Sequence, residues 1–240
     1  LDHIPPSMAD LAAIRLGSVA FFGLLATQCL AQPPYPDFPG EPVYRVINDT
    51  VEAIWQLPPS GRPPRALVFV SHPHVACARR FWPPSRACPV CNGFNNMMCI
   101  VAHLVAHDLA VFVVSAPSRT FLHRPFHPNT GWEWPKDKEA MERALAFAKE
   151  AVQGPGGRLP LLLLSLSSGA LPAFDLPGLG YRFAAHASVM PHMAVVGHGA
   201  HGHPPTLIYH QPRDRWRSGM AVKAIKELRR AGIPALRIEA

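Results

Sequence analysis

One serine lies at a predicted corner of the chain where its hydroxyl could act as a nucleophile. The run LPLLLLSLSSGA over residues 159–170 starts as a continuous apolar stretch and ends in small and polar residues. Such a run predicts a buried β-strand that turns directly into a helix. A serine at that corner is held above the sheet, as in the pattern G-x-S-x-G; the alternative is a strand end followed by a serine-rich helix cap. Ser167 is the candidate nucleophile, with Gly169 in the last position of the pattern and Ser165 in place of the first glycine.

The segments around this corner alternate between predicted strands and predicted helices. Segments 43–47 and 51–57 alternate apolar and polar residues around Asn48-Asp49-Thr50, which predicts a hairpin. The fold class is therefore α/β, with a mostly parallel, doubly wound sheet and an N-terminal antiparallel hairpin. The other predicted strands are 66–71, 109–116, the run before Ser167, 181–190, 206–210 and 235–239, and the predicted helices are 95–107, 136–152 and 218–231.

Several function classes are disfavoured by what the chain lacks. No G-x-G-x-x-G follows the first buried strand, which argues against a dinucleotide-binding fold, and no G-x-x-x-x-G-K-[ST] occurs. The net charge of +7 is spread along the chain, without runs of lysine and arginine interleaved with aromatic residues. Nucleic acid is therefore not an expected partner.

The N-terminal segment has the pattern of a secretory signal peptide. Residues 16–30 are almost wholly apolar or small, Arg15 precedes them, and Cys29-Leu30-Ala31 offers a small-x-small cleavage site. The predicted location is secreted or lumenal. The alternative is an uncleaved membrane anchor, since only the length of the apolar run distinguishes the two. A membrane is a predicted partner only in that case.

The length of 240 residues suits one α/β domain with appendages. Residues 1–31 are assigned to a few upstream residues and the signal peptide or anchor. Residues 32–42 form a proline-rich linker, and residues 43–240 form the folded domain.

Four cysteines remain if the signal peptide is removed, and all lie in one short segment: Cys77, Cys88, Cys91 and Cys99. In an oxidising compartment such an even set predicts two disulfides, with three pairings open. The alternative is a structural zinc site, because Cys88-Pro89-Val90-Cys91 has the C-x-x-C ligand spacing. Cys77 and Cys99 do not supply a second pair with that spacing, so disulfides are favoured.

The order of these features resembles the α/β-hydrolase superfamily. The resemblance rests on the hairpin, the alternating strands and helices, and the serine corner after the third buried strand, and it runs from residue 43 to the C-terminus. More closely, the segments SHPHVA (71–76), FWPPS (81–85) and CPVC (88–91) resemble a group of uncharacterised plant and algal hydrolase-like proteins.

The resemblance implies a serine nucleophile, an acid after a later strand and a histidine after the last strand. Ser167 would be the nucleophile, and Asp214, just past strand 206–210, would be the acid. The alternative for Asp214 is a solvated turn or a helix cap. No residue past the last predicted strand supplies the histidine. Either the sequence is a fragment, or another histidine substitutes (His192, His198, His201 or His203), or the fold has lost the chemistry, because a serine without a base is a poor nucleophile.

The resemblance also implies an oxyanion hole formed by two backbone N–H groups. One would belong to Ser168, directly after the nucleophile, and the other to the loop after strand 66–71. Pro73 in that loop has no N–H to donate, so the second donor would be His74 or Val75.

The chain contains one histidine-rich loop, with His198, His201 and His203. It lacks accompanying cysteines or carboxylates, so a solvent-exposed loop is favoured over a metal site. No metal or cofactor is predicted. The two leading hypotheses are a serine hydrolase acting on an ester or related acyl substrate, with that small molecule as partner, and a non-catalytic protein of the same fold with a binding or structural role. A metal-binding protein is a distant third.

Overall fold

The computed structural model describes residues 38–74, 76–117, 137–153, 159–191, 202–211 and 213–239. The predicted signal peptide or anchor and the first part of the proline-rich linker lie outside these residues. So do Val75 and three of the candidate histidines, His192, His198 and His201.

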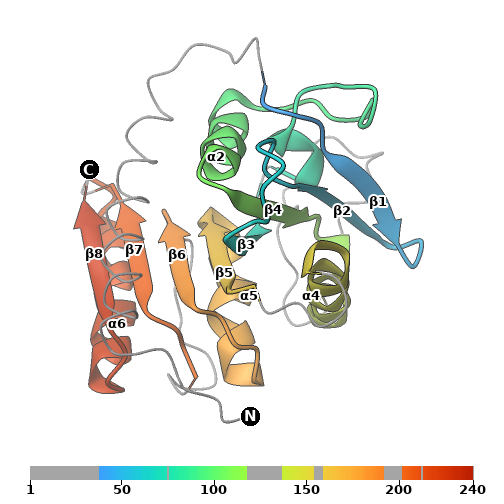
Figure 1. The fold of residues 1–240 in the computed structure, drawn as a ribbon. Helices are drawn as coiled ribbons and strands as arrows, with labels where there is room; N and C mark the ends of the chain where they lie inside the picture. The colour runs from blue at the N-terminus through green and yellow to red at the C-terminus, as the bar shows by residue number, and fades with distance from the viewer. Residues whose placement is uncertain are drawn as a thin grey trace, which may run out of the picture.

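The described strands form one eight-stranded sheet in the order β1-β2-β4-β3-β5-β6-β7-β8 (Figure 1). From the central β3, the chain winds to one side through β4 and to the other through β5 to β8. Pairing is antiparallel between β1 and β2 and between β2 and β4, and parallel everywhere else. The predicted mostly parallel, doubly wound sheet with a leading hairpin is confirmed. The strands are β1 (Val43–Ile47), β2 (Val51–Gln56), β3 (Ala66–Ser71), β4 (Leu109–Val114), β5 (Leu161–Leu166), β6 (Ala185–Val189), β7 (Thr206–His210) and β8 (Ala235–Glu239).

Helices cover both faces of this sheet. The side chains of β5 alternate between the two faces: Leu162 and Leu164 join the cluster with α2, while Leu161 and Leu163 join the cluster with α4. Residues of α5 and α6 pack with Ile208 of β7. The α-helices are α2 (Asn95–Ala106), α4 (Lys138–Gln153), α5 (Ala170–Asp175) and α6 (Arg215–Arg230), and the 3-10 turns are η1 (Ala78–Phe81), η2 (Ser167–Gly169) and η3 (Leu176–Leu179).

The β1–β2 hairpin turns through residues that tolerate positive φ angles. Asn48 and Asp49 have φ values of 47° and 55°, and the N–H of Thr50 donates to the carbonyl of Ile47 at 3.2 Å. Positive φ at both central positions is typical of the tight turns that match the twist of paired strands.

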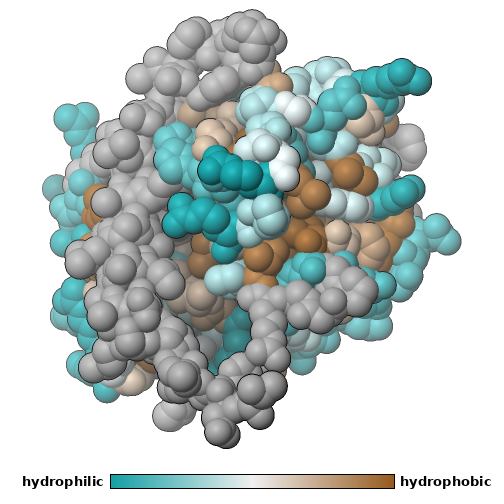
Figure 2. All heavy atoms as spheres, viewed as in Figure 1, coloured by the Kyte–Doolittle hydropathy of each residue, from teal (hydrophilic) through white to brown (hydrophobic). Residues whose placement is uncertain are grey.

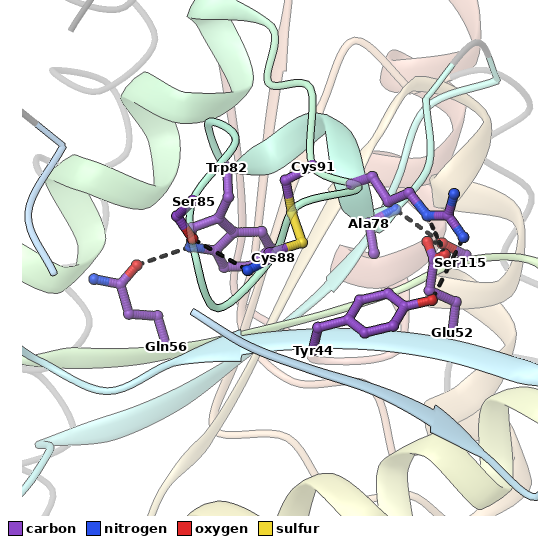
Figure 3. The surroundings of a disulfide bond; sticks show 10 residues. Tyr44, Glu52, Gln56, Ala78, Trp82, Ser85, Cys88, Cys91 and Ser115 are labelled. Atoms are coloured by element: carbon purple, nitrogen blue, oxygen red, sulfur yellow. Dashed lines mark hydrogen bonds and ion pairs between the residues drawn. A yellow bond between two sulfur atoms is a disulfide. The ribbon is translucent and has the colours of Figure 1, made fainter. Parts of the chain in front are cut away.

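The loop from residue 72 to residue 94, called here the cysteine loop, is fastened to β2 by two polar side chains. Trp82 is fully buried and donates its indole N–H to Gln56 at 2.8 Å. Glu52, 1% exposed, forms an ion pair with Arg79 and accepts a hydrogen bond from Ser115 at 2.8 Å. Figure 3 shows these contacts on either side of a disulfide. The loop is therefore a packed segment, even though its described residues contain a single turn of 3-10 helix.

The disulfide in this loop joins Cys88 to Cys91, whose Cα atoms lie 5.4 Å apart. The N–H of Cys91 donates to the carbonyl of Cys88 across the same turn, so a local turn brings the two sulfurs together. Cys77 is a buried free thiol, and Cys99 is disulfide-bonded but not to Cys77. The prediction that all four cysteines pair among themselves is therefore wrong. Burial, with the nearby charge of Glu52, raises the pKa of the Cys77 thiol and keeps it protonated.

The surface in Figure 2 mixes hydrophilic and hydrophobic residues, with the hydrophobic ones that are visible gathered mainly over the β2 and β4 side of the sheet. Within the described ranges, no helix is both long enough and apolar enough to cross a membrane.

Candidate functional site

The strand-to-helix corner predicted at Ser167 is present. β5 ends at Leu166, Ser167 opens η2 with a φ of 50°, and α5 follows directly at Ala170. A positive φ is rare for serine and costs about 1–3 kcal/mol, so the surrounding structure must hold it. The side chain is half-buried, and in the described part of the chain its hydroxyl makes no hydrogen bond. Among the described residues, Ser167 is thus presented at the end of the strand without a competing hydrogen-bond partner.

Only glycine fits in the last position of the motif. A Cβ on Gly169 would lie 2.2 Å from the carbonyl oxygen of Ser71 and 2.8 Å from that of His72. Both obstacles are backbone atoms of the central strand and its continuation, so no side chain can be accommodated without moving β3 or the elbow. The elbow is therefore packed directly against the end of β3.

Ser165 replaces the first glycine of the motif and has its own buried partners. Its hydroxyl lies 2.9 Å from Nε2 of His186 and donates to Ser188 at 2.9 Å. With that donation made, the His186 ring must supply the Nε2–H, which leaves its buried Nδ1 without a hydrogen-bond partner among the described residues. Burial, with a smaller contribution from His203, lowers the pKa of His186 to about 3, so the ring is neutral near pH 7. The serine is thus built into a neutral polar network beneath the elbow.

The loop that would carry the second oxyanion donor is held by His72. The buried His72 ring accepts the N–H of Ala116 on Nε2 at 2.9 Å, so its Nδ1 carries the proton and donates to the carbonyl of Pro73 at 2.8 Å. His74 is half-buried next in the loop. Ser168 is the second residue of η2, and N–H groups in the first turn of a helix lack intrahelical acceptors.

Asp214 lies at the same edge of the sheet as Ser167 but also begins a helix. It follows the carboxyl end of β7, and since only β6 separates β5 from β7, the ends of these two strands are roughly 10 Å apart. The carbonyl of Asp214 accepts the N–H of Ser218 at 2.8 Å, which is the first turn of α6. This bond explains why α6 starts at Arg215 and not at residue 218 as predicted. The helix-start interpretation of Asp214 therefore describes its backbone, and the residue is half-buried.

His203 does not lie where a base for Ser167 would be needed. It precedes the amino end of β7 and packs against Phe174, at a ring-centroid distance of 5.9 Å. Ser167 follows the carboxyl end of β5, and β5, β6 and β7 run parallel, so the two residues are at opposite edges of the sheet. Burial also lowers the pKa of His203.

His210 is a residue that the sequence analysis did not single out. It is the last residue of β7, fully buried, and pairs in register with Glu239, with 3.8 Å between Nε2 and a carboxylate oxygen. Leu166, Val189 and Tyr209 form one row across the sheet, so Ser167 and His210 each stand one residue past that row. The only sequence signal was its position as the closing residue of a predicted strand.

In the ranges that the structure describes, no three metal-ligating side chains come together. Cys88 and Cys91, the zinc alternative, are joined to each other. Most of the histidine-rich loop lies outside the described residues.

No protein-family model and no curated protein matches the chain. Solved structures do match in fold. An arylesterase is 11% identical with a TM-score of 0.60, covering 96% of this chain and 87% of its own. A bacterial brefeldin A esterase, a homologue of human hormone-sensitive lipase, is 12% identical with a TM-score of 0.58, covering 100% of this chain and 80% of its own. A dienelactone hydrolase from Anabaena variabilis is 15% identical with a TM-score of 0.57, and the match covers 85% of this chain and 87% of the hydrolase. The chain has the α/β-hydrolase fold.

Proposed function

We propose that this protein is a serine hydrolase that cleaves an ester or a related acyl substrate, with Ser167 as its nucleophile. The observation that carries the proposal is the elbow: a serine at positive φ, half-exposed, directly after the strand next to the central one, with Gly169 packed against the backbone of β3. The sequence departs from the usual motif only at Ser165, and that side chain is accommodated by His186 and Ser188. Several matching structures are esterases, which supports the choice of an ester substrate.

In this mechanism the Ser167 hydroxyl attacks the carbonyl carbon and gives its proton to a general base. The backbone N–H groups of Ser168 and His74 stabilise the negative oxygen that forms. The alcohol leaves with a proton, and water then releases the acid from the acyl-serine. Asp214 is the acid that orients the general base, as the resemblance to the α/β-hydrolase superfamily implies.

The second candidate is a non-catalytic protein of the same fold. One observation favours it: within the described residues, the Ser167 hydroxyl has no histidine partner. His72 and His186 are engaged elsewhere, and His203 lies at the opposite edge of the sheet. A serine hydroxyl without a base reacts slowly near neutral pH.

A fluorophosphonate probe separates the two candidates. We expect the folded wild-type protein to label, Ser167→Ala not to label, and Ser60→Ala to label as the wild type does. Ser60 is an exposed serine before β3, at the amino edge of the sheet, and is a matched control for unspecific serine labelling. Absence of wild-type labelling, beside a reference hydrolase that labels, would contradict the catalytic proposal.

We also propose that the protein works in an oxidising compartment, either secreted or lumenal. Support comes from the Cys88–Cys91 disulfide, since such bonds are rare in reducing compartments. This disulfide lies in the segment that resembles the plant and algal proteins. Alkylation of protein from its native source, followed by mass spectrometry, tests the proposal: Cys88 and Cys91 should be modified only after reduction, and modification before reduction would contradict it.

A further inference from the structure

The end of β3 touches the elbow through both its side chain and its backbone. The hydroxyl of Ser71 donates to the carbonyl of Gly169 at 2.7 Å, and both residues are buried. The carbonyl of Ser71 lies against the Cα of Gly169 so closely that no Cβ would fit between them. Ser71 also pairs in register with Ser165. Three contacts therefore join the last residue of the central strand to the motif that carries Ser167.

The next residue along the chain fastens a different segment. His72 uses one ring nitrogen to bind Ala116, just past β4, and the other to bind Pro73 in its own loop. Ser71 thus bonds to the elbow that follows the neighbouring strand β5, while His72 bonds to the segment that follows β4, the neighbour on the other side. Loop 72–74, which contains His74, starts from this fixed point.

The two proposed oxyanion donors come from these two segments. Ser168 belongs to the elbow and His74 to the loop, so their separation depends on how the elbow sits against the end of β3. An oxyanion hole works only when its donors are already placed around the developing charge. A displacement of about 1 Å can lower a reaction rate about a hundredfold.

We propose that Ser71 is a positioning residue that sets the elbow carrying Ser167 against loop 72–74, through its hydrogen bond to Gly169. The catalytic part of this inference rests on the function proposed above. Ser71 itself does not touch the substrate. It lies beneath the elbow, fully buried, and acts through the Gly169 carbonyl.

A matched variant distinguishes positioning from general stability. Thr206 donates its hydroxyl to the carbonyl of Pro204 at 2.8 Å, a buried bond of the same kind at the start of β7. The amino end of β7 lies at the opposite edge of the sheet from the elbow. Thr206→Val removes that hydroxyl as Ser71→Ala removes its own. Ser71→Cys is a milder third variant, because a thiol of similar shape is a weaker donor.

The experiment measures two quantities in the whole protein. The first is hydrogen exchange of the amides at 170 and 171, where the N–H of Ala170 bonds to the carbonyls of Ser167 and Ser168. The second is the rate of fluorophosphonate labelling. We expect Ser71→Ala to speed exchange of these amides about tenfold and to slow labelling about 10- to 100-fold, with Ser71→Cys between it and the wild type. Thr206→Val should change neither quantity.

The outcomes separate this inference from the proposed function. Suppose that the wild type does not label, and that amide exchange at the elbow is faster in the Ser71 variants but not in Thr206→Val. The hydrolase proposal then fails, and the positioning role of Ser71 stands. If Ser71→Ala changes exchange at the elbow no more than Thr206→Val does, the inference is overturned, whether or not the wild type labels. If Ser71→Ala speeds exchange at the elbow but labels as fast as a wild type that does label, the catalytic part of the inference is overturned.

Discussion

At the scale of single residues, the site combines strain with burial. Ser167 holds a backbone angle that serine disfavours, and His186 is a neutral ring enclosed beneath it. Both features cost stability, and both make measurable predictions.

Replacing Ser167 by glycine should stabilise the protein relative to replacing it by alanine. Both variants lose the hydroxyl, but only glycine adopts a φ of 50° without strain. Glycine also adds flexibility to the unfolded chain, so we expect a net difference of about 1 kcal/mol in the free energy of unfolding. Urea unfolding of the two variants measures it. Equal stabilities would contradict the prediction, because the strain at this residue would then be no larger than the cost of glycine in the unfolded chain.

Acid should destabilise the protein through His186. Its pKa is about 3 in the folded protein against 6.5 ordinarily, so the unfolded chain binds more protons as the pH falls below about 6.5. The folded state therefore loses stability as the pH falls from 7 towards 3, by about 2 kcal/mol at pH 5 from this group. His203, which adds to the shift, acts in the same direction.

His186→Gln tests this dependence, because a side-chain amide keeps a donor for Ser165 but does not titrate. The free energy of unfolding should fall less between pH 7 and pH 5 in this variant than in the wild type. Thr206→Val removes a buried hydroxyl that does not titrate, so it is the control and should leave the pH dependence as in the wild type. An unchanged slope in His186→Gln would contradict the prediction.

At the scale of elements, the cysteine loop depends on β2 more than on regular structure of its own. β2 pairs with β1 and β4, and its Glu52 and Gln56 contact Arg79 and Trp82 of the loop. The contacts at Arg79 and Trp82 explain how a long segment with a single 3-10 turn packs against the sheet.

Removing the charge of Glu52 should therefore be costly. Glu52→Gln leaves Arg79, whose side chain is 24% exposed, without its buried counter-ion, so we expect a loss of about 1.5–3 kcal/mol, below the cost of breaking a fully buried pair. The control is Arg62→Gln, because Arg62 is 70% exposed in its pair with Asp108 and such surface pairs contribute about 1 kcal/mol or less. Chemical denaturation compares the two. Similar losses in both variants would show that the Glu52 pair does not hold the loop.

At the scale of the whole molecule, stability should be concentrated in the centre of the sheet. Leu163 of β5 is 1% exposed and lies between β3 and β6, whereas Leu236 of the edge strand β8 is 41% exposed. Leu163→Ala should cost about 2–5 kcal/mol, because it leaves a cavity in a packed interior, and Leu236→Ala well under half of that. Thermal or urea unfolding tests this order, and the reverse order would show that the sheet does not pack as described.

The order of strands and helices could be predicted from local patterns of apolar and polar residues in the sequence. Apolar runs such as 161–164 and the small residues after them are adjacent in the chain, so the corner at Ser167 could be predicted along with the sheet. The ends of elements were harder to predict, as at α6, where a backbone bond to Asp214 extends the helix.

The sequence by itself determined the fold class, the corner and the candidate nucleophile, because burial and periodicity are read from neighbouring residues. The tertiary structure alone decided that Cys77 is unpaired, that His203 lies at the far edge, and that Gly169 is wedged against Ser71. The Ser71–Gly169 bond joins residues 98 positions apart. No local pattern encodes such a contact, because it exists only when parallel strands distant in the chain are brought side by side.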